Sequence, residues 1–158
     1  MPARAAGTRH FAILPYPAEL VETIEWQGAP LTLRPIRPED EAQHREFIER
    51  LEPVDIRMRV FYTRRELPRS ELARLMQIDY AREMAFIAER TRADGARETI
   101  GAVRAVADPN DLEAEFAIIV RSDVKRQGLG HLLLDKIVRY ARGRGLKRLV
   151  GMVLRENS

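Results

Sequence analysis

The sequence predicts a single α+β domain in which helices flank a mixed, mostly antiparallel central sheet. The first observation is a set of consecutive strand-like runs between residues 84 and 120, separated by tight turns, which is typical of antiparallel strands. The second is a run with helical period after residue 128, followed by another strand-like run at 148–154. The chain has 158 residues, enough for one domain with a sizeable core.

The first half of the chain is predicted to hold a leader and the start of the domain. Residues 1–30 are expected to form a leader or linker with short strands, and the domain proper is expected to span residues 31–158. The domain begins with an alternating strand at 31–36. Asp40 is expected to cap the helix that follows, with Gln43 completing a capping-box-like pair. Further helical stretches are predicted at 54–62 and 70–80.

The second half supplies most of the sheet. Strands are predicted at 84–90, 99–106 and 112–120. A helix then places Leu129, Leu133, Ile137 and Tyr140 on one face, and Gly145 is a suitable residue to end it. The strand at 148–154 follows.

Composition excludes several classes of protein. The chain has no Cys, which removes disulfides, thiolate metal sites and a Cys nucleophile, and agrees with the cytoplasmic location that we predict. It has no apolar run of about 18 residues, so no membrane segment is expected. The net charge of +3 is mild, and no nucleic-acid recognition motif is present. His10, His44 and His131 lack the spacing of metal ligands, so no metal site is predicted.

The most informative stretch is the cationic, Gly-rich turn at 124–131, between a buried strand and a helix. Free backbone N–H groups at such a turn form an anion site, to which the helix dipole adds. Lys125 and Arg126 oppose that dipole by roughly 0.3–1 kcal/mol each. A local rule broken in this way often marks a functional site, and an incoming polyanion would explain it.

The spacing of this turn narrows the identity of the anion. A dinucleotide fingerprint needs a third Gly where Leu133 stands, and a P-loop needs a Gly-Lys-Ser/Thr run that is absent. The stretch resembles the acyl-CoA pyrophosphate loop of the GNAT acetyltransferase superfamily. Lys125, Gly128 and Gly130 match that motif, with Lys in the place of the usual Arg or Gln. On the residues alone, the turn could also be a plain helix start with two glycines.

The resemblance covers residue 31 to the end and is strongest to the GNAT domain of bacterial protein lysine acetyltransferases of the Pat type. It implies acetyl-CoA as cosubstrate, without a metal. Residues 1–30 resemble the segment that joins a synthetase-like domain to a GNAT domain in such proteins; on the residues alone, they could also be an unremarkable N-terminal extension. The resemblance assigns the pantetheine arm to Ile118, Ile119 and Val120, the pyrophosphate to Lys125, Arg126, Gln127, Gly128, Leu129, Gly130 and His131, and a further cofactor contact to Asn157.

Glu115 is the candidate catalytic residue. It lies two residues from Glu113 on the same face of its strand, and between Ala114 and Phe116 we expect it to be the more deeply buried of the two. Burial disfavours the charged carboxylate and so strengthens it as a proton acceptor. The resemblance implies that Glu115 is the general base. On the residues alone, it could also be a partly exposed carboxylate paired with an Arg.

The sequence departs from the family at its C-terminus. GNAT domains continue beyond the strand at 148–154 with a further helix and strands, whereas this sequence ends at Ser158. We therefore expect a GNAT-like fold that lacks its C-terminal helix and last strands. An unpaired edge at 148–154 would invite self-association.

The predicted function is transfer of an acetyl group from acetyl-CoA to an amine. The favoured acceptor is a protein lysine, for example of an acyl-CoA synthetase; the Arg-rich run at 57–69 suits an acidic protein surface, although it could also be a solvated face. One alternative is the same chemistry on a small amine. Another is a non-catalytic acyl-CoA-binding regulatory module, which would bind without turnover. Neither nucleic acid nor membrane is expected as a partner.

Overall fold

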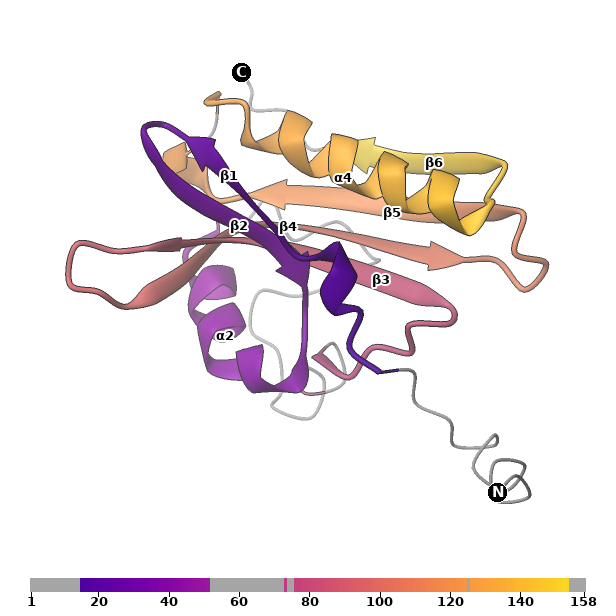
Figure 1. Ribbon diagram of the computed structural model, residues 1–158, viewed down its shortest axis with the longest axis horizontal. Coiled ribbons are helices and arrows are strands. Elements are labelled where there is room, and N and C mark those ends of the chain that lie inside the picture. Colours follow the sequence, from indigo (N-terminus) through magenta and orange to yellow (C-terminus); the bar gives the residue numbers. More distant parts are fainter. Residues whose placement is uncertain (1–14, 52–72, 74–75, 125, 154–158) are drawn as a thin grey trace.

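The computed structural model describes residues 15–51, 73, 76–124 and 126–153, and its centre is a six-stranded sheet in the order β1-β2-β3-β4-β5-β6. Helix α2 lies on one face of the sheet and α4 on the other (Figure 1). The strands are β1 (Glu22–Trp26), β2 (Ala29–Pro35), β3 (Glu83–Thr91), β4 (Arg97–Ala107), β5 (Glu113–Val120) and β6 (Arg148–Val153). The helices are η1 (Ala18–Leu20), η2 (Pro38–Asp40), α2 (Glu41–Glu49), η4 (Ser122–Val124) and α4 (Leu129–Arg144).

Strand direction confirms the predicted mixed, mostly antiparallel sheet. Each neighbouring pair from β1 to β5 is antiparallel, and only β5 and β6 are parallel. Parallel neighbours need a long crossover, and α4 supplies it between β5 and β6. The predicted α+β, GNAT-like arrangement is therefore present. The prediction that the edge strand at 148–154 mediates self-association stays a prediction.

The two faces of the sheet carry separate hydrophobic cores. Met84 and Phe86 of β3 pack on the α4 side, whereas Ala85 and Ile87 of the same strand pack on the α2 side. This alternation follows from the period of two in a strand. Because β3 and β4 are covered on both faces, they carry continuous apolar runs, at residues 84–88 of β3 and 100–103 of β4, and Arg104, which follows in β4, is a buried charge. The sheet is thus a rigid support for the loops at its ends.

The N-terminal strand is part of this sheet. β1 pairs with β2, and its last residue, Trp26, is buried in the core on the α4 side. One of the short strands expected in residues 1–30 is therefore β1, which is part of the sheet. The division of the chain into a leader at 1–30 and a domain from residue 31 stays a prediction. The predicted helical stretch at 54–62, and most of the one at 70–80, lies outside the described residues.

The predicted capping box at the start of α2 is wrong. The Asp40 carboxylate makes no capping hydrogen bond to α2. It accepts hydrogen bonds from the backbone N–H of Arg37 (2.9 Å) and from the buried guanidinium of Arg34 (2.8 and 2.9 Å). The Gln43 amide donates to Glu89 and Thr99 instead of pairing back. A buried cation needs a carboxylate partner more than a helix terminus does, and this decides which bond Asp40 makes.

Candidate functional site

The candidate site is the loop that leads from β5 through η4 to the start of α4. Gly128 is the residue before the helix and has φ 85°, and Arg126 has φ 69°. The Leu132 N–H donates to the Gly128 carbonyl (3.2 Å), so the N–H groups of Leu129, Gly130 and His131 precede the first backbone hydrogen bond of the helix. Such N–H groups, together with the helix dipole, form a site for an anion such as a phosphate group.

Close packing places the start of α4 beside the end of β5. A Cβ atom on Gly101 of β4 would lie 3.0 Å from Leu133 and 3.1 Å from Leu129, so the helix lies tightly against β4 at this glycine. A Cβ atom on Gly130 would lie 3.9 Å from the Val120 side chain, at the end of β5. The N–H groups at the start of α4 therefore lie beside Val120, the last residue of β5.

Among the described residues, the backbone of β5 continues past Ile118, the last residue paired with β6. The Arg121 N–H donates to the Ile100 carbonyl of β4 (2.9 Å). Because hydrogen-bonding direction alternates along a strand, the N–H and C=O groups of Ile118 and Val120 point to the other side, toward β6. The described register of β5 with β6 ends where Ile118 faces Val153. Residues 154–158, which follow β6, lie outside the described residues, and among the described residues the Val120 backbone faces no paired strand on this side. An extended, amide-containing ligand can pair with such a backbone as a strand would.

Glu115 is exposed and Glu113 half-buried, so the expectation that Glu115 is the more deeply buried is wrong. Glu115 lies in register with Val106 of β4 and Val150 of β6, which are themselves 37% and 43% exposed. In the described part of the chain, α2 covers this face of the sheet further along β5, at Ala117. The alternation of the strand fixed the face on which Glu115 lies, but how far a helix covers that face depends on tertiary packing.

The remaining predicted site residues are only partly brought together. The alternation of β5 directs the backbone of Ile119 to β4, and Ile118 is paired with Val153 of β6. Of these three residues, only Val120 has its backbone on the β6 side beyond the described pairing, so Val120 is the best placed to bind a pantetheine arm. Gln127 and His131 are exposed at the start of α4. Lys125 and Asn157 lie outside the described residues.

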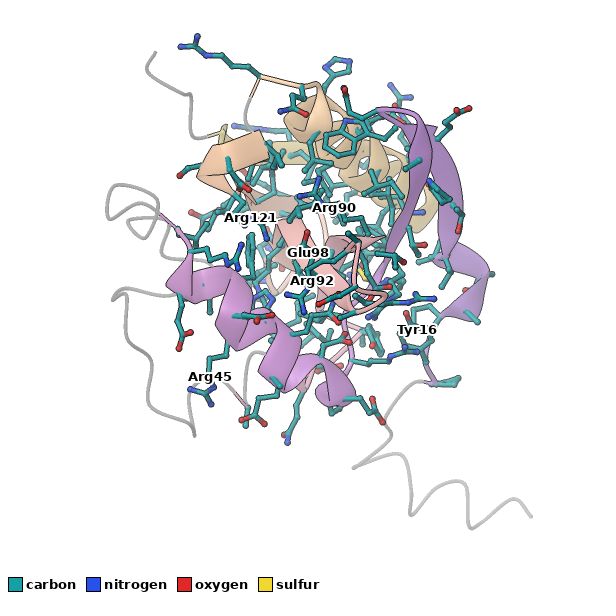
Figure 2. The ribbon with its side chains drawn as sticks, turned by 90° about the vertical axis from the view of Figure 1, so that its left-hand side faces the viewer. Tyr16, Arg45, Arg90, Arg92, Glu98 and Arg121 are labelled. Carbon is teal, nitrogen blue, oxygen red and sulfur yellow. The ribbon has the colours of Figure 1, made fainter. Side chains whose placement is uncertain are left out.

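Several residues that hold this loop were missed by sequence reasoning. The Trp26 indole N–H donates to the Gln127 carbonyl (2.9 Å), and Arg121 is buried in contact with Glu98. Figure 2 shows Glu98 and Arg121 close to Arg90 near one end of the sheet. A charged residue such as Glu98 at the start of an apolar strand was a weak signal of such a contact. Nothing in the sequence pattern links Trp26 to a loop 101 residues away.

The described residues contain no group of three or more His, Cys, Asp or Glu side chains that could hold a metal ion. His44 is buried on the α2 side of the sheet. Burial, followed by the charge of Arg104, lowers the pKa of His44 to about 3, so this imidazole is neutral at pH 7. In the part of the chain that the structure describes, no helix is long and apolar enough to cross a membrane.

The fold is an α+β fold in which a helix that starts at a glycine turn crosses between two parallel strands of a mostly antiparallel sheet. Residues 40–157 match the acetyltransferase (GNAT) family. Acetyltransferase PA5475 of Pseudomonas aeruginosa is 31% identical over 129 residues, which are 82% of this chain and 68% of that protein. The chain belongs to the GNAT acetyltransferase family, whose members are acetyl-CoA-dependent N-acetyltransferases, and the predicted resemblance is confirmed.

Solved structures agree with this assignment. The GNAT domain of PAT from S. lividans has a TM-score of 0.73 and 26% identity, covering 90% of this chain and 83% of that one. A cAMP-binding acyltransferase from Mycobacterium smegmatis has a TM-score of 0.56 and 25% identity, covering 89% of this chain and 41% of that one. The similarity to a Pat-type GNAT domain therefore extends over nearly the whole chain.

Proposed function

We propose that this GNAT acetyltransferase acetylates lysine side chains of a protein, with an acyl-CoA synthetase as the favoured class of acceptor. The observation that supports the proposal is the start of α4, where the N–H groups that precede the first hydrogen bond of the helix lie beside Val120 at the end of β5. The similarity to the S. lividans PAT domain over 90% of the chain supports a protein acceptor.

The loop would hold the pyrophosphate of acetyl-CoA through backbone N–H groups. Gly128, with φ 85°, turns the chain into the helix, and an L side chain at this position would be strained. The N–H groups that follow it, at Leu129, Gly130 and His131, would donate to phosphate oxygens. Lys125, Arg126 and Gln127 complete the proposed loop, and Asn157 is the further proposed contact.

The edge of β5 would hold the pantetheine arm. The Val120 backbone points to the β6 side beyond the described pairing of β5 with β6, and amide groups of an extended arm could pair with it. Ile118 and Ile119 are the neighbouring proposed contacts of the arm. When bound, acetyl-CoA supplies an activated acetyl group. The edge of the strand orients that group along β5, on which the candidate base also lies.

Glu115 would accept the proton of the amine. A lysine amine has a pKa of roughly 10.4 in water, so it is protonated at pH 7 and needs an acceptor. The exposed position of Glu115 lets an acceptor protein reach it. The exposed Val106 and Val150 on either side suit the methylene chain of a lysine.

The exposure of Glu115 also favours a second candidate, a non-catalytic acyl-CoA-binding regulatory module. Such a module would use the same loop and the same strand edge. It would bind acetyl-CoA without transferring the acetyl group, and replacement of Glu115 would change nothing measurable.

Titration calorimetry with acetyl-CoA tests the proposal. We expect binding by the intact chain and a loss of at least tenfold in affinity in Gly128→Glu, because the new carboxylate would lie at the phosphate site. Gly145→Glu is the matched control, since Gly145 ends the same helix with φ 86° and equally open surroundings. Equal effects of both substitutions, or no binding by the folded wild-type chain, would contradict the proposed site. Acetyl transfer to a synthetase lysine then separates the enzyme from the regulatory module.

A further inference from the structure

The loop is fixed at its first end by a buried network of charges. The Arg121 guanidinium donates to Glu98 of β4 (3.1 Å) and to both carboxylate oxygens of Asp123 in η4 (2.7 and 2.8 Å). Glu98 also accepts a hydrogen bond from Arg90 of β3 (2.8 Å). Arg121 and Glu98 are both buried, and Figure 2 shows them beside Arg90. The start of the loop is therefore bonded to two strands of the sheet.

The charges of this network balance, and they persist at neutral pH. The hydrogen bonds between Arg121 and Asp123 raise the pKa of Arg121 and lower the pKa of Asp123. Burial opposes ionisation of Glu98, but the hydrogen bonds from Arg90 and Arg121 outweigh it and lower the pKa of Glu98. Removing one partner would leave a buried charge uncompensated, which is costly. The network thus holds the position at which the chain leaves β5.

The second end of the loop is fixed by Trp26. Its indole N–H donates to the Gln127 carbonyl (2.9 Å), and its ring is buried in the core at the end of β1. In a planar trans peptide, the C=O and the following N–H point in opposite directions. Because Trp26 binds the Gln127 carbonyl, the Gly128 N–H of the same peptide unit is directed away from Trp26. This contact therefore orients the Gly128 N–H, which directly precedes the N–H groups of Leu129, Gly130 and His131 at the proposed phosphate site.

We propose that Trp26 and Glu98 are positioning residues for the pyrophosphate-binding loop. Trp26 orients the peptide between Gln127 and Gly128, and Glu98 acts through Arg121 on the start of the loop. Neither residue contacts the cosubstrate. Donors that are oriented before binding cost less free energy to order, so both residues raise the affinity for the pyrophosphate group. This inference rests on the proposed function.

The test compares two acetyl donors in Trp26→Phe and Glu98→Gln. Trp26→Phe keeps an aromatic ring and removes the indole N–H, while Glu98→Gln keeps the shape and removes the charge. Each protein is titrated by calorimetry with acetyl-CoA and, at higher concentration, with S-acetylpantetheine, which has the same thioester arm but no pyrophosphate. Loss of one oriented hydrogen bond corresponds to roughly a fivefold to tenfold loss of affinity. We expect that loss for acetyl-CoA and a change below twofold for S-acetylpantetheine.

Matched controls separate positioning from general destabilisation. Tyr140→Phe keeps its ring and removes a hydrogen bond with Arg144 (3.0 Å) near the other end of α4. Glu46→Gln removes an exposed carboxylate of α2 that pairs with Arg92 (3.8 Å) and is not part of the network of Arg90, Glu98, Arg121 and Asp123. Both controls should bind acetyl-CoA like the wild-type chain. Thermal melting of every variant confirms that it is folded, and Trp26→Phe decides the question alone if Glu98→Gln does not fold.

Two results would overturn the inference while leaving the proposed function intact. One is unchanged acetyl-CoA affinity in the folded variants. The other is an equal loss for both donors, which would mean that the substitutions act on the whole fold. Failure of the folded wild-type chain to bind acetyl-CoA is a different result, since it would refute the proposed function and this inference together.

Discussion

Glu115 is the residue on which the proposed chemistry depends. It lies in one row across the sheet with Val106 and Val150, and both neighbours are exposed. Glu113 lies two residues earlier on the same face and pairs with Arg148 at 3.8 Å. The two glutamates lie on the same strand and face but have different neighbours, so Glu113 is a matched control for substitutions of Glu115.

Replacing Glu115 with Gln should lower turnover roughly 100-fold, because a general base contributes about this factor. The affinity for acetyl-CoA should stay within twofold, since the loop and the β5 edge are unchanged. Steady-state acetylation of a synthetase lysine, with calorimetry for binding, measures both quantities. Glu113→Gln is the control and should retain most of the turnover. Similar losses in both variants would argue against a specific role of Glu115.

At the scale of the element, α4 connects the proposed phosphate site to the N-terminal strand. Lys136 is buried on this helix, with a side chain only 5% exposed, and its ammonium group donates to the Leu20 carbonyl (2.6 Å) and to Glu22 (2.7 Å). Arg139, one turn further on, donates to the same oxygen of Glu22 (2.9 Å) with a side chain 49% exposed. The helix thus holds β1, and with it Trp26, through one buried and one exposed cation.

Lys136→Met should lower the free energy of unfolding by roughly 1.5–3 kcal/mol, the usual loss for a buried hydrogen bond to a charged group. Arg139→Met should lower it by less than about 1 kcal/mol, because exposed ion pairs contribute little. Urea denaturation at pH 7 measures both values. The difference would vanish if the exposed pair were as strong as the buried one, and our account of β1 attachment would then be wrong.

At the scale of the whole molecule, one ion cluster joins the two halves of the fold. The buried Arg34 of β2 bonds Asp40 before α2 and Glu89 of β3 (3.0 and 3.2 Å). Glu89 also accepts hydrogen bonds from Gln43 (3.0 Å) and Arg97 (3.0 Å). Burial opposes ionisation of Glu89, but the hydrogen bonds from Arg34 and Gln43 outweigh it and lower the pKa of Glu89 to about 2.

This shift predicts a dependence of stability on pH. The ordinary pKa of a glutamate is 4.5, so between this value and about 2 the unfolded chain binds a proton that the folded chain does not. The stabilising contribution of Glu89 is therefore complete above pH 4.5 and is lost as the pH falls toward 2. Urea denaturation between pH 7 and 2.5 should show this loss in the wild-type chain.

Glu89→Gln should be less stable at pH 7 and should show a flatter decline below pH 4.5. Glu49→Gln, which alters an exposed residue of α2, is the control and should decline like the wild-type chain. Parallel declines in all three proteins would show that Glu89 does not govern the acid sensitivity of the fold.

The sequence by itself determined where strands lie along the chain from residue 31 onward, which face of α4 is apolar, and where the Gly-rich turn precedes that helix. These features are local: a strand repeats every two residues, a helix every 3.6, and glycine permits positive φ. The turn at Gly128 and Gly130, together with Lys125, Glu115 in the preceding strand and the strand after the helix, indicated the family that residues 40–157 match. The alternation of residues 31–36 likewise predicted the strand that is β2 (Ala29–Pro35).

Only the tertiary structure decided how these parts meet. It exposed Glu115, because helical cover of a sheet face is not encoded in the strand itself. It gave Asp40 to Arg34, because a buried cation far along the chain competes with a local cap. It placed Trp26 against Gln127 and Glu98 against Arg121. Such contacts join residues distant in sequence, and their strength depends on burial, which arises only when the sheet and its helices pack together.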